Sequence, residues 1–105
     1  MAQFDVYRNP NRASRTRIPY LLDVQSDLLE PLATRIVVPL CKPDVLGGKP
    51  AERLNPAFVV EGRKVLMLTP ELAGVPRRVL GEQVANLAAE RSMIVAALDL
   101  AITGI

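Results

Sequence analysis

The periodicity of the apolar residues changes once along the chain, close to Glu82. Before this point, apolar and polar residues alternate over short segments such as Gln3–Tyr7, a pattern typical of β-strands with one buried face. After it, apolar residues recur every three or four positions, as they do along one face of a helix. Several short strands followed by one terminal helix predict a mainly β or α+β fold.

Two further strands are predicted before a long loop. They are Tyr20–Gln25 and the β-branched segment Thr34–Leu40. Pro39 has no backbone donor, so we expect that end of the second strand to lie at an edge, a bulge or a terminus. Cys41–Leu54 is repeatedly interrupted by Pro and Gly, which predicts a loop.

The next segment has the pattern of a hairpin. Pro56–Val60 and Lys64–Thr69 flank a short turn that contains Gly, and a turn of this length joins antiparallel strands. The continuous apolar run Val65–Leu68 indicates a strand buried on both faces, in the middle of a sheet. Pro70–Leu72 is then expected to form a helical turn and Val75–Leu80 a last short strand.

The C-terminal segment is predicted to be one helix beginning at Glu82. About twenty residues at a rise of about 1.5 Å each give a length of roughly 30 Å. Gly104 occupies the position of a left-handed C-terminal cap, so the helix is expected to end next to the chain terminus. The residues at helical spacing are Val84, Leu87, Ala88, Ile94, Val95, Leu98 and Ile102.

Length and charge narrow the class of protein. A chain of 105 residues has room for one domain, which we expect to span residues 1–105. The net charge of +2 is too small to indicate an autonomous nucleic-acid binder. The N-terminal residues lack the charged start and apolar run of a signal peptide, and no apolar stretch approaches the roughly 20 residues of a membrane span. A soluble cytoplasmic protein without membrane contact is expected.

The residues that the chain lacks bear on its chemistry. It has no His and a single Cys, Cys41, which argues against the usual zinc sites and against His-based acid–base catalysis. Gly47-Gly48-Lys49 is interpreted as a turn rather than a phosphate-binding loop, because no strand precedes it and no helix follows. We therefore predict no catalytic residues, no metal and no cofactor.

An ordered series of segments resembles one known family. The chain opens with Gln3-Phe4 and continues, after one residue, with Val6-Tyr7, and the segment from Leu22 to Leu29 reads Leu-Asp-Val-Gln-Ser-Asp-Leu-Leu. Together with later segments they resemble the CcdB toxins of bacterial toxin–antitoxin systems over the whole chain. The later segments are Arg35–Leu40, Met67–Thr69, Leu72-Ala73, Val75-Pro76, Leu80-Gly81 and Gly104-Ile105.

The resemblance implies a fold, partners and an activity. CcdB-like proteins have an SH3-like barrel of antiparallel strands with a C-terminal helix, and they form symmetric homodimers. They bind the A subunit of DNA gyrase and trap it on cleaved DNA. A CcdA-like antitoxin neutralises them through its disordered tail, and the two together bind operator DNA and repress their own operon.

The resemblance also implies which residues face gyrase. Three come from the turn after the second strand, where we expect one of the two leucines to be exposed. Four come from the helix end, where the best-known plasmid-borne member has Trp in place of Thr103 and Asn in place of Asp99. The full set is Ser26, Leu28, Leu29, Asp99, Thr103, Gly104 and Ile105.

Alternatives remain open at this point. The MazF-type endoribonuclease toxins share the fold, and fold alone does not fix function. A dimeric operon regulator that has lost toxicity is a third possibility, which the absence of Trp at position 103 favours. The arginine-rich loop Arg8–Arg17 is interpreted as a solvated loop, with contact to an acidic antitoxin tail or to operator phosphates as the alternatives.

Overall fold

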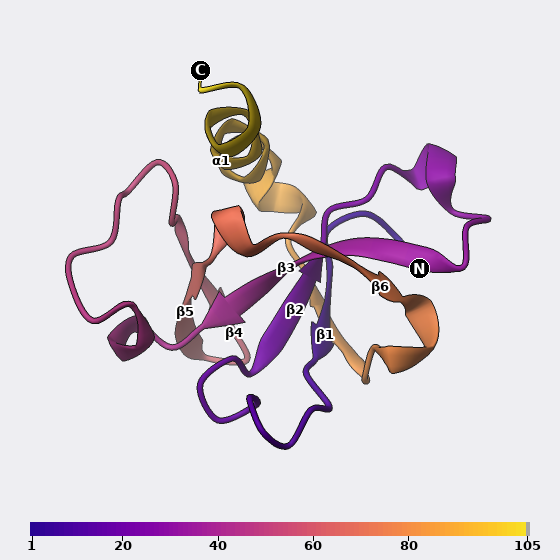
Figure 1. Cartoon of the computed structure of the whole chain (residues 1–105), viewed down its shortest axis with the longest axis horizontal. Coiled ribbons are helices and arrows are strands. Elements are labelled where there is room, and N and C mark those ends of the chain that lie inside the picture. Colours follow the sequence, from indigo (N-terminus) through magenta and orange to yellow (C-terminus); the bar gives the residue numbers. More distant parts are fainter. Residues whose placement is uncertain (105) are drawn as a thin grey trace.

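A computed structural model describes residues 1–104 as one curved antiparallel sheet with a helix at the C-terminus (Figure 1). The expected fold class, a mainly β or α+β fold of antiparallel strands in an SH3-like barrel with a C-terminal helix, is confirmed, and the strands form a half-barrel. The elements are β1 (Asp5–Arg8), β2 (Tyr20–Asp23), β3 (Thr34–Cys41), β4 (Ala57–Val60), β5 (Arg63–Met67), β6 (Ala73–Pro76), β7 (Gln83–Asn86) and α1 (Arg91–Thr103).

Strand β3 organises the sheet. The strands follow the order β4-β5-β3-β2-β1-β7, and β6 pairs with the first half of β3 while β5 pairs with its last two residues. Pro39 lies between these two partners, where a missing donor leaves no ladder hydrogen bond unmade, and its carbonyl accepts the Leu68 N–H at 2.9 Å. Pro39 therefore lies inside β3, opposite Leu21 of β2, and not at the edge, bulge or terminus that the sequence led us to expect. The change of partner on its other side explains why a proline is tolerated there.

The hairpin of β4 and β5 closes through Glu61 and Gly62, whose φ angles are 52° and 75°. Two consecutive positive φ angles characterise the turn that matches the right-handed twist of paired strands. In β5 and just after it, Val65, Leu66, Met67 and Leu68 are all buried, which confirms the prediction of a strand covered on both faces.

The main core lies between the concave face of the sheet and helix α1. It is built largely from aliphatic side chains such as Val6, Leu22 and Leu40, with Phe4 and Phe58 as the aromatic members besides Tyr20. The helix contributes Ile94 and Ala97, which are fully buried.

The predicted helix start at Glu82 is wrong. Residues Gln83–Asn86 form strand β7, which pairs antiparallel with β1, and α1 begins only at Arg91. Backbone pairing with β1 outweighs the local helical spacing of Val84 and Leu87, since such long-range hydrogen bonds are not visible in the apolar pattern. The helix therefore has 13 residues and a length of about 20 Å.

The predicted strand Val75–Leu80 is also only partly correct. Strand β6 ends at Pro76, and residues Arg77–Val79 form a short 3-10 turn instead. The Arg77 N–H still donates to the Ala33 carbonyl at 2.9 Å, one step beyond the β3–β6 pairing, and its guanidinium binds the Glu30 carboxylate at 2.9 Å. The Leu80 N–H then donates to the Arg77 carbonyl at 3.3 Å, which closes the turn and ends the strand.

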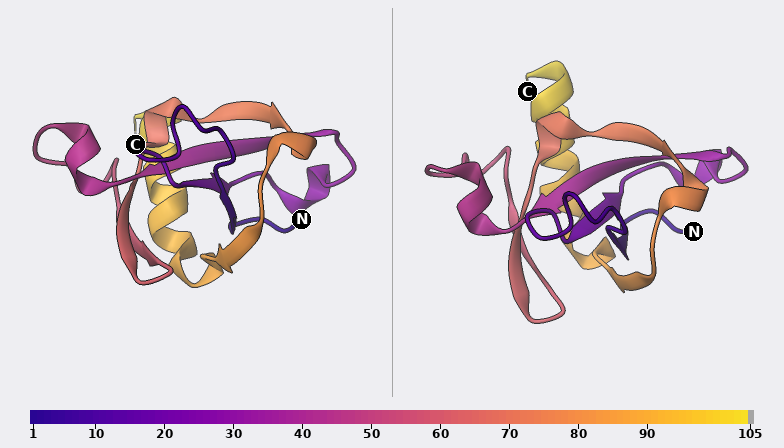
Figure 2. Two further views of the ribbon diagram at one scale, coloured as in Figure 1. Left: turned by 90° about the horizontal axis from the view of Figure 1, so that it is seen from below. Right: turned by 60° about the horizontal axis from the view of Figure 1, so that its bottom comes forward.

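The N-terminus lies apart from the end of helix α1 (Figure 1). The N-terminus and the helix C-terminus occupy opposite sides of the molecule in Figure 1 and in both views of Figure 2. The loop between β1 and β2 lies at the bottom of Figure 1, away from the helix end, and comes to the front when the molecule is seen from below (Figure 2). Among the described residues, no helix has the length and apolarity to cross a membrane.

Candidate protein-binding site

A short turn exposes two leucines on the side of the N-terminus. Residues Asp27–Leu29 form a 3-10 turn, η1, and the Ser26 hydroxyl caps it by accepting the Leu28 N–H at 3.2 Å. Leu28 is 90% exposed and Leu29 is 43% exposed. Both leucines are therefore accessible, whereas we expected only one of them to be exposed. The reason is that none of the three residues of the turn is buried.

A buried glutamine fixes the position of this turn. Gln25 is 2% exposed, and its side-chain oxygen accepts the Ile36 N–H at 3.1 Å. Its side-chain nitrogen donates to the Leu29 carbonyl at 3.0 Å. One side chain thus joins the start of β3 to the end of η1. Its burial is tolerated because both the oxygen and the nitrogen of the amide form hydrogen bonds.

A fully buried ion pair lies behind the glutamine. Arg35 Nε and Nη2 lie 2.8 and 2.7 Å from Asp23 Oδ2, and both side chains have no exposed surface. The other carboxylate oxygen accepts the Gln25 N–H at 3.0 Å. Burial raises the pKa of Asp23 above its ordinary value, and the Gln25 N–H and the Arg35 guanidinium offset part of that rise.

Asp23, Gln25 and Arg35 were not among the residues selected from the sequence. Their signal was nevertheless present, because each is a polar or charged residue inside an otherwise apolar strand segment. An acidic and a basic residue placed in this way on neighbouring strands are expected to pair with each other, since buried charges are almost always paired.

Surface contacts complete the support of η1. Asp27 Oδ1 accepts the Gln3 N–H at 2.8 Å, which ties the turn to the N-terminal segment. On the other side, Arg77 Nη1 donates to the carbonyls of Glu30 and Leu32, both at 3.3 Å. The turn is therefore held from three directions while Leu28 extends into solvent.

The second group of predicted residues lies at the end of α1. Asp99 and Thr103 are both exposed, and the Thr103 hydroxyl donates to the Asp99 carbonyl at 2.7 Å, one turn earlier. Gly104 has a φ of 78° and its N–H donates to the Leu100 carbonyl at 3.1 Å, which confirms the predicted left-handed cap. The predicted residue Ile105 lies outside the described residues.

Within one chain, the two groups of predicted residues do not meet. Ser26, Leu28 and Leu29 are together in one turn beside the N-terminus, and Asp99, Thr103 and Gly104 are together at the helix end. Because these two ends lie on opposite sides of the molecule, they form two separate surfaces (Figures 1 and 2).

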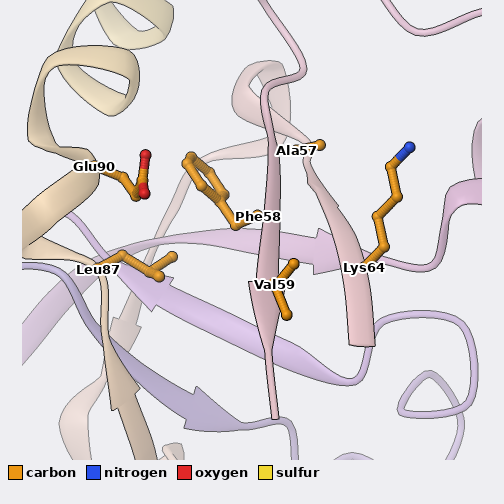
Figure 3. Close-up of a pocket in the computed structure, with 6 residues that line it drawn as sticks. All are labelled: Ala57, Phe58, Val59, Lys64, Leu87 and Glu90. Carbon is orange, nitrogen blue, oxygen red and sulfur yellow. The ribbon is translucent and has the colours of Figure 1, made fainter. Parts of the chain in front are cut away.

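A hollow of about 380 Å³ lies between the edge strand β4 and the start of the helix (Figure 3). Phe58 points from β4 toward Leu87 and Glu90, and Lys64 lies on the far side of the strand. Lys64 and Glu90 are the titratable side chains of its lining, and they lie on opposite sides of β4. The hollow therefore brings no pair of titratable groups together. In the described part of the chain, no group of three or more Cys, Asp or Glu residues is arranged to hold a metal ion.

Known structures share this fold. A solved structure described as "Endoribonuclease in complex with its cognate antitoxin from Mycobacterial species" aligns with a TM-score of 0.77 at 15% sequence identity, over 98% of this chain and 95% of that chain. A likeness at this identity establishes the fold alone. The model of the family described as CcdB protein matches residues 3–104. The chain therefore belongs to the CcdB family and is a toxin of a toxin–antitoxin system.

Proposed function

We propose that this protein poisons DNA gyrase by binding its A subunit and trapping the enzyme on cleaved DNA. The observation that carries the proposal is the η1 turn, where Leu28 is 90% exposed although its backbone is held by a buried polar network. An apolar side chain on a rigid, exposed support loses little conformational freedom when a partner buries it, which suits it as an anchor of an interface.

The helix end provides the second gyrase-facing surface. Asp99, Thr103 and Gly104 lie at its final turn, and Ile105 follows them in the sequence. We expect the protein to act as a homodimer, in which a two-fold axis presents two copies of each surface to a pair of gyrase A subunits related by a two-fold axis of their own. This arrangement accounts for contact residues that lie on opposite sides of one chain.

Inhibition requires no chemistry by the toxin. The dimer binds the open, DNA-cleaved conformation of gyrase more tightly than the closed one, and this difference in affinity shifts the enzyme toward the cleaved state. A CcdA-like antitoxin binds the toxin through a disordered tail that folds on contact, so that part of the interaction energy is spent on ordering the tail. Together, toxin and antitoxin bind operator DNA and repress the operon.

A DNA cleavage assay tests the proposal. Purified gyrase, supercoiled plasmid and ATP are incubated with increasing amounts of the protein, and the products are separated with and without protease. Linear DNA that enters the gel only after protease treatment is the expected result, because trapped gyrase stays covalently attached to the ends. Unchanged supercoiling without linear DNA contradicts gyrase poisoning.

The fold likeness favours one alternative, an endoribonuclease toxin, since the aligned structure is described as such an enzyme. At 15% identity this concerns the fold alone, and the chain has no His to act as the general base. Digestion of a mixed RNA substrate separates the two. RNA cleavage with no effect on gyrase supports the ribonuclease, and inactivity in both assays supports a non-toxic dimeric operon regulator.

A further inference from the structure

The fold gathers several arginines around the loop that joins β1 and β2. A hollow of about 420 Å³ is lined there by Arg8, Arg15 and Arg63, together with Glu82. A second hollow, of about 500 Å³, adjoins it and includes Arg78. Asn9 and Pro10 line both hollows, so the two form one surface divided by this segment, which we term the arginine face.

The loop that carries Arg15 is ordered by a buried asparagine. Asn9 is 8% exposed, and its side-chain nitrogen donates to the Ser14 hydroxyl at 3.0 Å and to the Ile18 carbonyl at 2.9 Å. Its side-chain oxygen accepts the Asn11 N–H at 3.0 Å. This prebuilt loop holds the backbone of Arg15 in place before any ligand arrives, which lowers the entropic cost of binding.

The two carboxylates beside the arginine face, Glu61 and Glu82, both pair with Arg8, so these three side chains together carry one negative charge. Arg8 binds Glu82 through Nε at 2.9 Å and Glu61 through Nη2 at 2.8 Å, and the Tyr20 hydroxyl donates to the second Glu61 oxygen at 2.7 Å. The remaining cations form no ion pair within the described part of the chain. These are Arg12, Arg15 and Arg17 of the loop, with Arg63 and Arg78.

The uncompensated charge is therefore local even though the whole chain carries only +2. Guanidinium groups of this kind bind phosphate oxygens in a forked geometry. The aromatic side chain at the site is not available for stacking on a base, because Tyr20 is 1% exposed and the Arg63 Cζ lies 5.9 Å from its ring centroid. A surface with charge but no stacking platform favours the backbone of a duplex over a single strand.

We propose that the arginine face binds the phosphate backbone of duplex DNA without reading its sequence. Its position at the end of the barrel away from the helix tip allows this contact while the helix end engages a protein partner (Figures 1 and 2). The inference deepens the operon-regulating part of the proposed function and rests on it for its biological setting. It does not require gyrase binding.

The test is fluorescence anisotropy of the full-length protein with a 20-base-pair labelled duplex of arbitrary sequence, at about 25 to 150 mM salt. Contact with about three phosphates predicts that affinity falls about 20-fold between 50 and 150 mM salt. The double variant Arg15→Ala/Arg63→Ala is expected to reduce the slope of log affinity against log salt by about two-thirds. A matched control, Lys49→Ala/Arg91→Ala, removes two cations that line neither hollow, and its slope is expected to stay that of the unmodified protein.

Two further variants keep the result interpretable. Arg63→Lys retains the charge and is expected to keep most of the binding, while Arg12→Ala/Arg17→Ala changes only exposed loop residues and is expected to weaken it. The proposal is overturned if the control double variant loses as much of the salt slope as Arg15→Ala/Arg63→Ala does. It is also overturned if Arg15→Ala/Arg63→Ala binds the duplex as tightly as the unmodified protein. So does tighter binding of single-stranded RNA or of a polyglutamate peptide at the same salt. Arg15→Ala/Arg63→Ala is expected to retain gyrase-dependent DNA cleavage, which separates failure of this inference from failure of the gyrase proposal.

Discussion

Arg35 Nη2 lies 2.7 Å from Asp23 Oδ2, in an ion pair from which both side chains are excluded from solvent. Replacing Arg35 with Met leaves a buried carboxylate without its cation, and the free energy of unfolding is expected to fall by about 3–5 kcal/mol. Urea denaturation at pH 7 measures the change. The variant Asp23→Asn/Arg35→Met removes both charges but keeps an acceptor for the Gln25 N–H. A double variant as unstable as the single one would show that packing, and not charge pairing, is the main contribution.

The ion pair illustrates what the sequence could and could not predict. Strands β1 to β5 were located to within two or three residues, because Val, Ile and Leu at alternating positions reflect one buried face. The pairing of Asp23 with Arg35 depends on the register of β2 against β3, which sets Asp23 opposite Val37. No local pattern specifies a register, so these two supporting residues were missed while the exposed leucines that they hold in place were found.

The start of the helix could not be predicted for a related reason. Ala85 pairs with Val6 and Asn86 pairs with Asp5, and these partners lie about 80 residues earlier in the chain. The Asn86 side-chain oxygen accepts the Ala88 N–H at 2.8 Å and turns the chain after the strand. An Asn in this position is a local sign of a turn, but the helical spacing of the neighbouring apolar residues obscured it.

A tyrosine beside the ion pair gives a prediction for alkaline pH. Burial, with the Asp5 carboxylate nearby, raises the pKa of Tyr7 from 10.0 to about 12. Because the folded pKa lies above the unfolded one, this group's contribution to stability is complete below pH 10 and is lost as the pH rises to 12. The loss is at most about 2.7 kcal/mol. Unfolding free energies measured between pH 9 and 12 should therefore fall less steeply for Tyr7→Phe, and identical slopes for the two proteins would contradict the assignment.

A glycine before β7 is expected to resist substitution. A Cβ built on Gly81 would lie 2.5 Å from the Arg8 carbonyl oxygen, a backbone atom that cannot move independently of β1. Gly81→Ala should lower the free energy of unfolding by about 1–3 kcal/mol. Gly74→Ala is the matched control, since a Cβ there meets no atom within 4 Å. Thermal unfolding compares the two, and equal melting temperatures would mean that β1 and the Gly81 segment can separate freely.

The exposed leucine of η1 is expected to affect gyrase and not folding. Leu28→Ala changes a side chain that is 90% exposed, so its free energy of unfolding should stay within about 0.5 kcal/mol of the unmodified protein. If Leu28 is an interface anchor, the concentration needed for half-maximal DNA cleavage should rise at least tenfold, which corresponds to about 1.4 kcal/mol. Val59→Ala, on the edge strand β4 and 67% exposed, removes a similar apolar group elsewhere and should leave cleavage unchanged.

The helix end offers a test by gain of function. Thr103 is exposed, and a Trp at this position, as in the best-known plasmid-borne member of the family, would place a large apolar side chain beside the left-handed cap at Gly104. Aromatic anchors in interfaces commonly contribute 2 kcal/mol or more, so Thr103→Trp should strengthen binding to the gyrase A subunit by about 30-fold. Isothermal titration calorimetry measures the affinity directly. Met93→Trp, at the opposite end of α1 and 45% exposed at present, adds the same side chain away from the tip. Stronger binding by both variants would indicate nonspecific apolar contact, whereas a gain limited to position 103 would place the helix tip in the gyrase interface.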